Sequence, residues 1–218
     1  DNKVVFPEAY ADAGMANGWY TLSGKIDLKP APEVSADGAV TVASGSDFIQ
    51  SMSDNAAGVN TMNLTSDVNM MGASHGSISM DRDFTLNGGN NTIYNLVSTE
   101  YASVGTGSYI YAGKQYGSGL FGDIGVSTSG APEINVVIKD VVFDGLVTGD
   151  YETGSTGIIA GTIRRNATVT LQDVTFKNCT VYGLNKAGLI AGQIKGKLIL
   201  KNVKIENSVV NASEGESG

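Results

Sequence analysis

Gly119-Leu120-Phe121-Gly122 is the first of three copies of one phrase: a glycine, two bulky apolar residues and a small residue. The other copies are Gly157-Ile158-Ile159-Ala160 and Gly188-Leu189-Ile190-Ala191, so the spacing is 38 residues and then 31. Self-similarity at such a spacing is typical of stacked repeat folds, in which each unit buries its apolar face only against its neighbours. The phrase predicts an architecture but not a function, because stacked repeats serve as enzymes, adhesins and spacers.

A second set of segments extends the repeat. Four segments align on an apolar residue and the turn that follows it: Ile93–Val97, Phe143–Val147, Phe176–Thr180 and Ile205–Val209. Three segments just upstream align as well: Ile138–Val141, Leu171–Val174 and Leu200–Val203. Apolar and polar residues alternate in these segments, as a half-buried strand requires. The alignment predicts four coils that share one register.

The composition of the repeats distinguishes a β solenoid from a helical one. Gly accounts for 29 of the 218 residues, about twice its usual share, and the repeat units are rich in Val, Ile and Thr. Helices tolerate this mixture poorly. A parallel β-helix needs it, because Gly and Asn take positive φ at tight corners with little steric cost.

One aligned position carries only small turn residues: Asn95, Gly145, Asn178 and Asn207. We expect these residues to form a structural turn ladder, in which stacked Asn amides hydrogen-bond from coil to coil. A second aligned position holds Asp140, Asp173 and Asn202, which we expect to be solvated or turn-capping.

A short helix is predicted upstream of the repeats, over Asp47–Met52. Ser46 is the expected N-cap, and Asp47 suits the positive end of the helix dipole. Phe48, Ile49 and Met52 would plug the open end of a solenoid.

The order of these elements, and the segment Leu86–Tyr94, resemble the start of pectate-lyase-like right-handed β-helices. The Gly-Leu-Phe-Gly copies resemble the GLUG repeat of bacterial surface proteins, and the chain from about Val40 to Val210 resembles secreted β-helix modules of Bacteroidetes. This resemblance implies an all-β fold: a single-stranded right-handed parallel β-helix with a short N-terminal capping helix.

The chain divides into three parts by pattern. Residues 1–39 are expected to form an extension or entrance strands, and residues 40–210 the parallel β-helix, with repeats near 86–98, 119–148, 157–182 and 188–210. Residues 211–218 are expected to form a flexible acidic tail that leads to a removed or further segment. No bulky cap follows Val210, so either the chain was cut from a longer protein or its last coil associates end to end.

Composition restricts the classes of partner and the location. The net charge of −8 disfavours nucleic acid, since phosphate binding needs a basic surface. Arg164-Arg165 and the lysines at 195 and 197 are the local basic clusters, and we expect them to be solvated turn residues. The alternative is that Arg164 or Arg165 binds an anionic ligand. No apolar segment is long enough to span a membrane. Few charges and much Ser, Thr, Asn and Gly fit an extracellular or bacterial cell-surface location. The single Cys excludes an internal disulfide.

The sequence shows no catalytic constellation. A polysaccharide lyase or glycoside hydrolase would need a strong base beside calcium-binding acids, or carboxylates at suitable separations. His75 lies alone in a loop, and Asp81-Arg82-Asp83 offers at most half of a calcium site. We therefore expect no catalytic residue, no bound metal and no cofactor, with calcium unsupported.

The segment best suited to binding is a long insertion between the Asn95 and Gly145 coils. The expected ligand-binding residues are four tyrosines of the insertion and two residues of a shorter excursion: Tyr101, Tyr109, Tyr111, Tyr116, Asp150 and Tyr151. Insertions in repeat proteins lie on one face, and Tyr rings stack on sugars or anchor proteins. The opposing interpretation makes Tyr109–Tyr111 a further strand.

We expect a non-enzymatic adhesive or structural module of a larger bacterial surface protein, which binds a glycan or a surface protein. One alternative is a polysaccharide-degrading or carbohydrate-binding β-helix. Another is a subunit that self-assembles end to end through its uncapped C-terminal coil.

Overall fold

The computed structural model describes residues 3–5, 19–21, 32–53, 58–70, 79–100, 119–150, 154–183 and 186–212. The chain falls into two units, Asp1–Pro30 and Ala31–Gly218. The first unit contains β1 (Lys3–Val5) and β2 (Trp19–Thr21), which pair antiparallel with Val4 opposite Tyr20. The remaining residues of this unit, which belong to the predicted entrance strands, lie outside the described residues.

Within its described residues the second unit is all-β apart from one helix, and its named strands pair in parallel. Its elements are β3 (Ala39–Val42), α1 (Gly45–Ser53), β4 (Thr61–Leu64), β5 (Val68–Asn69), β6 (Phe84–Tyr94), β7 (Val97–Glu100), β8 (Phe121–Ile124), β9 (Ile134–Asp144), β10 (Val147–Asp150), β11 (Ser155–Thr156), β12 (Ala160–Ile163), β13 (Ala167–Lys177), β14 (Thr180–Gly183), β15 (Lys186–Ala187), β16 (Ala191–Ile194), β17 (Lys197–Glu206) and β18 (Val209–Ala212).

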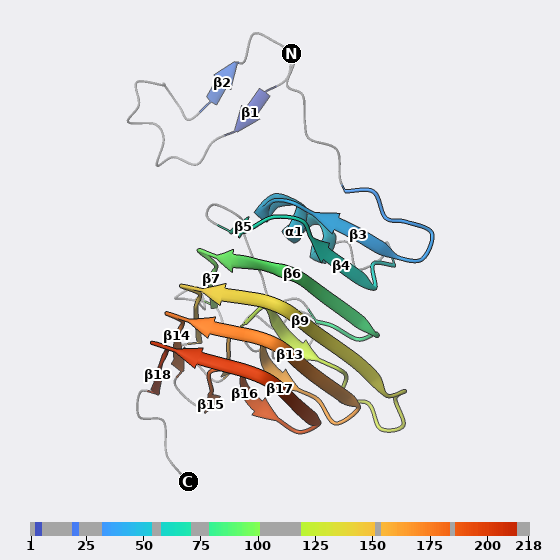
Figure 1. Ribbon diagram of the computed structural model, residues 1–218, viewed down its shortest axis with the longest axis vertical. Helices are drawn as coiled ribbons and strands as arrows, with labels where there is room; N and C mark the ends of the chain where they lie inside the picture. The colour runs from blue at the N-terminus through green and yellow to red at the C-terminus, as the bar shows by residue number, and fades with distance from the viewer. Residues whose placement is uncertain are drawn as a thin grey trace. The chain divides into compact units, whose positions relative to one another are not determined.

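Successive passes of the chain build the same sheets. The largest sheet has the order β17-β13-β9-β6-β4-β3, with β5 also paired to β6 (Figure 1). Two smaller sheets have the orders β18-β14-β10-β7 and β16-β12-β8, and β11 pairs with β15. The chain therefore returns to each sheet once per pass and adds a strand beside the strand of the previous pass.

The register of the large sheet confirms the alignment of the repeats. Phe176 lies between Phe143 and Ile205, and Ile93 pairs with Phe143 from the other side. The rings of Phe143 and Phe176 stack with centroids 5.4 Å apart. Because each pass keeps its apolar side chains at the same height, identical positions meet in the core.

The three long strands β9, β13 and β17 each bend at one polar residue without leaving the sheet. Asp140, Asp173 and Asn202 all have positive φ, between 50° and 54°. In β9 the buried residues alternate through Ile138, skip two positions and resume at Val141. The left-handed residue thus keeps the apolar side chains facing inward on both sides of the bend.

The three glycine phrases stack in neighbouring passes. Leu120 donates its backbone N–H to the Ile158 carbonyl, and Ile158 donates to Leu189. A Cβ on Gly119 would lie 2.5 Å from the Gly157 oxygen, so the glycines allow the passes to approach closely. The alignment is one residue wrong between β8 and β12, because Ala160 pairs with Phe121 and not with Gly122. It is correct between β12 and β16, where Ala160 pairs with Ala191.

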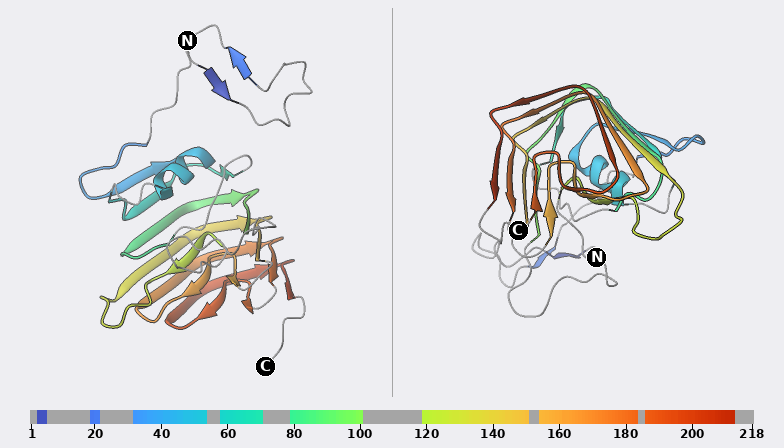
Figure 2. Two further views of the ribbon diagram at one scale, coloured as in Figure 1. Left: turned by 180° about the vertical axis from the view of Figure 1, so that it is seen from behind. Right: turned by 90° about the horizontal axis from the view of Figure 1, so that it is seen from below.

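The helix forms where predicted but starts earlier. Ser44 is the N-cap: its Oγ accepts a hydrogen bond from the Asp47 N–H at 3.3 Å, and its carbonyl accepts from the Phe48 N–H. The predicted cap, Ser46, lies inside the helix. Phe48 and Met52 are buried, and Ile49 packs on the core. Figure 2 shows α1 at the N-terminal end of the second unit, inside the outline of the sheets.

Candidate functional site

The residues predicted to bind a ligand lie almost entirely outside the described part of the chain. This applies to Tyr101, Tyr109, Tyr111, Tyr116 and Tyr151. Asp150 is the last residue of β10, where its backbone pairs with Glu100 and Gly183. The hypothesis of a binding surface on these residues stays a prediction.

The four residues of the turn ladder occupy one corner of the stacked passes. Each has a positive φ, from 46° at Asn207 to 69° at Gly145. Their amides do not bond to one another: Asn95 Nδ2 donates to Asn69 at 3.0 Å, and Asn178 Nδ2 donates to Asp144 at 2.7 Å. The side-chain bonds still connect one pass to the next, so the corner is structural.

The last pass, β16 to β18, exposes side chains that are buried in the pass before it. Ile205 is 56% exposed although its neighbour Phe176 is fully buried, and Leu200 is 51% exposed beside the buried Leu171. Val210 likewise lies half exposed beside a buried valine. Among the described strands, β16, β17 and β18 each pair on one edge only. This apolar surface with its unpaired strand edges is called the open end below; its strands are the ones drawn in orange-red in Figure 2.

The opposite end of the second unit is closed. Val34 bridges Val40 antiparallel on the outer edge of β3, and Ser35 bonds to Ala39 through both its backbone N–H and its hydroxyl. The helix α1 covers the core beneath them. An additional strand would therefore find an available edge at β17 but a partly occupied one at β3.

The two ends also differ in charge. The last described pass, residues 186–212, contains five lysines and one acidic residue, Glu206, for a net charge of +4. Residues 31–81, which include β3 and α1, contain six acidic residues and no Lys or Arg. The open end is basic in a chain whose net charge is −8.

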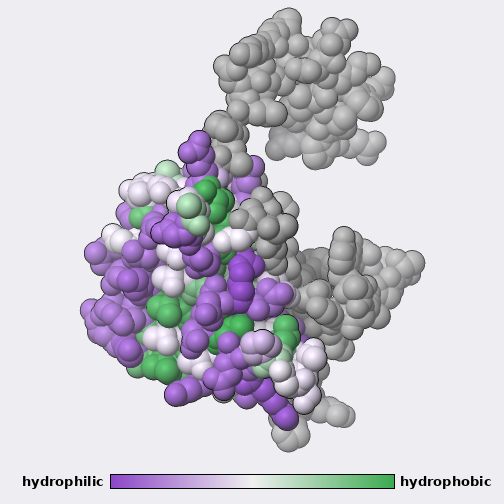
Figure 3. Space-filling model, turned by 90° about the vertical axis from the view of Figure 1, so that its right-hand side faces the viewer, coloured by the Kyte–Doolittle hydropathy of each residue, from purple (hydrophilic) through white to green (hydrophobic). Residues whose placement is uncertain are grey.

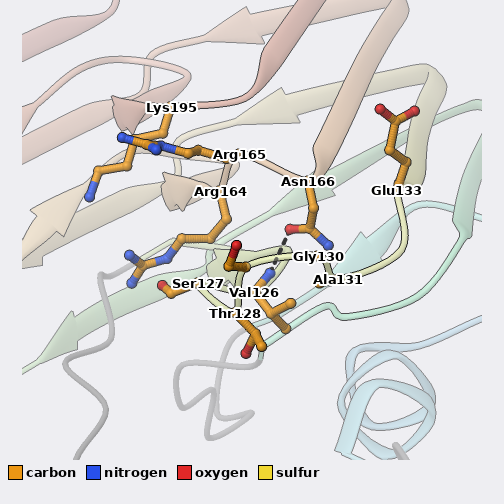
Figure 4. Close-up of a pocket in the computed structure, with 11 residues that line it drawn as sticks. Val126, Ser127, Thr128, Gly130, Ala131, Glu133, Arg164, Arg165, Asn166 and Lys195 are labelled. Atoms are coloured by element: carbon orange, nitrogen blue, oxygen red, sulfur yellow. Dashed lines mark hydrogen bonds between the residues drawn. The ribbon is translucent and has the colours of Figure 1, made fainter.

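A polar pocket lies at a corner where three passes turn into the large sheet. Its volume is about 520 Å³, and it lies between the loop 126–133 and the turns at 164–166 and 195 (Figure 4). Asn166 holds this loop at both ends, because its Oδ1 accepts from the Val126 N–H and its Nδ2 donates to Pro132, each at 2.8 Å. A Cβ on Gly125 would lie 2.6 Å from Asn166 Oδ1, so the loop needs glycine there.

Three cationic side chains line this pocket. Figure 4 shows that Arg164, Arg165 and Lys195 extend toward the same side, while Glu133 lies at the other side. Arg164 Nη2 forms an ion pair with Asp123 Oδ2 at 2.7 Å. Neither Arg165 nor Lys195 is within ion-pair distance of a described carboxylate, and both are exposed.

Asp123 is the buried acid beside the pocket. Burial raises the pKa of its carboxyl above the ordinary 3.8, although the Arg164 guanidinium opposes the shift. Its Oδ1 has no hydrogen-bond partner. The Arg164–Asp123 pair therefore fixes the guanidinium of Arg164 at the pocket wall, while other N–H groups of that guanidinium stay available.

The repeat spacing in the sequence could have indicated that basic residues gather at this pocket. Arg164 and Lys195 are 31 residues apart, which is the spacing of the glycines at 157 and 188. Basic residues separated by one repeat stack in the folded chain. The expectation that these charges are merely solvated turn residues took each cluster alone and did not apply the repeat spacing.

The described residues offer no metal centre and no membrane span. Within them, no three His, Cys, Asp or Glu side chains lie together in a way that could hold a metal ion. Asp83, from the charged tripeptide, accepts a hydrogen bond from the Asn135 N–H, and Arg82 donates from Nε to the Val59 carbonyl. No described helix has the length and apolar character needed to cross a membrane.

Comparisons with known proteins give no assignment: no family model, no curated protein and no solved structure matches this chain. The function must therefore be argued from the open end and the pocket.

Proposed function

We propose that the chain is a single-stranded right-handed parallel β-helix that serves as a non-enzymatic structural or adhesive module of a larger extracellular bacterial surface assembly. In this module α1 caps the first coil and the open end is the joining surface. The observation that carries the proposal is the contrast between Ile205 and Phe176, which are register partners with opposite exposure. A further β segment on the open end would bury Ile205, as β17 buries Phe176.

Hydrophobic burial and backbone pairing favour such a segment. Covering each half-exposed side chain would stabilise by roughly 1 kcal/mol, and the unpaired groups of β17 would gain ladder hydrogen bonds. The lysines at 197, 201 and 204 hinder association of two open ends with each other, because like charges would face each other. They favour an acidic neighbour.

The opposite charges of the two ends favour a second candidate, head-to-tail self-assembly. The acidic first coils of one copy would then face the basic last coil of another. The occupied edge of β3 weighs against it, since only part of that strand can accept a new partner.

The test uses one double variant of the open end, measured against the wild type. The charge-neutral double substitution Leu200→Gln with Ile205→Gln should abolish binding of a hydrophobic dye such as ANS, with little change in melting temperature. Sedimentation velocity at low and high salt distinguishes the joining module from head-to-tail self-assembly. Head-to-tail assembly depends on opposite charges, so it weakens as the salt concentration rises. If the wild-type chain binds no dye and sediments as a monomer at every concentration, the open end is not a joining surface.

The non-enzymatic part has its own test. We expect purified chain, with and without calcium, to leave acidic and neutral polysaccharides uncleaved. Release of oligosaccharides from any of them would contradict the proposal.

A further inference from the structure

Arg165 and Lys195 are brought together by two successive turns of the chain. The backbone of Lys195 donates to the Ile163 carbonyl at 2.8 Å, and a Cβ on Gly196 would lie 2.2 Å from the Arg164 oxygen. The turns are therefore tightly stacked, and their backbones cannot separate to relieve repulsion between the side chains. Asp123 pairs with Arg164 and also attracts the Lys195 ammonium, but no described carboxylate lies within ion-pair distance of Arg165 or Lys195. A pocket wall with three cations and this one buried acid has an excess of positive charge, which stabilises an anion.

The opposite side of the pocket has a different chemistry. Glu133 accepts hydrogen bonds, and the loop between contributes the hydroxyls of Ser127, Thr128 and Ser129. The Glu133 carboxylate would repel a ligand that also carries negative charge on the part next to Glu133. The combination fits a ligand with an anionic group at one end and hydroxyl donors along the rest.

The lining also excludes several ligand classes. Among the described lining residues, Val126 is the only sizeable apolar side chain and none is aromatic, so these residues offer no desolvated surface to an apolar peptide side chain or a lipid tail. The surrounding face is mostly hydrophilic, with hydrophobic residues in separate small groups (Figure 3). A volume of about 520 Å³ suits a small-molecule ligand or one terminal unit of a larger one.

We propose that this pocket binds an acidic sugar residue, whose carboxylate or sulfate lies against Arg164, Arg165 and Lys195 and whose ring hydroxyls bond to Glu133 and the 127–129 loop. The site is separate from the tyrosine insertion and from the open end. It is independent of the proposed joining role.

The test is a titration followed by calorimetry or ligand-observed NMR. The probes are methyl glucuronide and the methyl glycoside of N-acetylneuraminic acid for the carboxylate, glucose 6-sulfate for the sulfate, and methyl glucoside and inorganic phosphate as controls. We expect at least one acidic sugar to bind with a dissociation constant of about 0.1–10 mM, and methyl glucoside to bind at least about tenfold more weakly.

Two matched double variants assign the binding to the pocket. Arg165→Gln with Lys195→Gln should weaken the acidic sugar about tenfold or more, since it removes two charge-assisted donors. Lys201→Gln with Lys204→Gln makes the same change in charge on exposed residues of the last pass outside the pocket, and should shift affinity less than about twofold. All four residues are exposed, so both variants should fold as the wild type does.

Three results would overturn the proposal. The first is a folded wild type that binds none of the acidic sugars. The second is equal weakening in both double variants, which would mean general charge attraction. The third is phosphate binding as tight as sugar binding, which would make the pocket a simple anion site without recognition of the ring.

Discussion

Asparagine and glycine at the turn ladder illustrate how single residues determine the corners of this molecule. All four positions require positive φ, which β-branched side chains adopt only with strain. Gly145 differs from the other three because no atom lies within 4 Å of the position that its Cβ would take. The corner there has room for a side chain, and only the backbone conformation selects the residue.

Two substitutions at Gly145 distinguish the effect of the positive φ from the effect of the room available to a side chain. Gly145→Asn should keep or raise the free energy of unfolding, by up to about 1 kcal/mol, because Asn accepts positive φ and the unfolded chain loses freedom. Gly145→Val should lower it by roughly 1–2 kcal/mol. Chemical denaturation of the two variants checks this. Equal stability of both would mean that this corner relaxes.

Asp123 is a single residue that should make the free energy of unfolding depend on pH. Its folded pKa is raised by burial, so above the unfolded value near 3.8 the folded state holds a proton that the unfolded state has released. This contribution to stability is therefore largest at acidic pH and is lost as the pH rises through the folded pKa. In Asp123→Asn the contribution is absent.

Urea denaturation from about pH 3.5 to about pH 7 measures the contribution of Asp123 to the free energy of unfolding. The stability of the wild type relative to Asp123→Asn should fall over the acidic part of this range and then level off. If the difference instead grows in favour of the wild type as the pH rises, the Arg164 ion pair dominates over burial.

At the scale of elements, the sequence predicted which segments repeat. It predicted the exact register between neighbouring strands and the ends of the elements only in part. The phrase at Gly119 and the alignment of Phe143 with Phe176 gave the correct neighbours, because identical apolar positions stack in a shared core. The one-residue difference between Ala160 and Gly122 could not be found, since both are small and the bulky residues at 120 and 121 are equally buried. The cap of α1 was misplaced because Ser44 and Ser46 are equivalent by residue type.

The pocket shows why the candidate site was harder to predict. Arg164 and Lys195 were recognised as basic but treated separately, although one repeat separates them. The loop that completes the pocket depends on Asn166, whose side chain bonds two backbone groups far away in sequence. A hydrogen bond of this kind has no periodic pattern, so neither composition nor spacing indicates it.

A matched pair of substitutions tests the difference between neighbouring strands. Phe176→Lys in β13 should lower the free energy of unfolding by more than about 4 kcal/mol, or prevent folding, since it buries an unpaired ammonium and removes a stacked ring. Ile205→Lys in β17 should change it by less than about 1 kcal/mol, because that side chain already faces solvent.

Melting curves of both variants are compared with the wild type. Similar losses in both would show that the last coil is covered in solution.

At the scale of the whole second unit, the sheets are asymmetric from end to end. One end carries a helix, an occupied strand edge and acidic residues; the other carries unpaired strands, exposed apolar side chains and lysines. An interior pass is stabilised by neighbours on both sides, whereas the last pass has only one. Local stability should therefore decrease from β9 and β13 toward β17.

Native-state hydrogen exchange of the isolated chain, resolved to single strands by mass spectrometry or NMR, tests this account most directly. The account predicts slow exchange in β9 and β13, clearly faster exchange in β17, and slowing of β17 when a further β segment occupies the open end. Equal protection of β13 and β17 in the isolated, monomeric chain would contradict it.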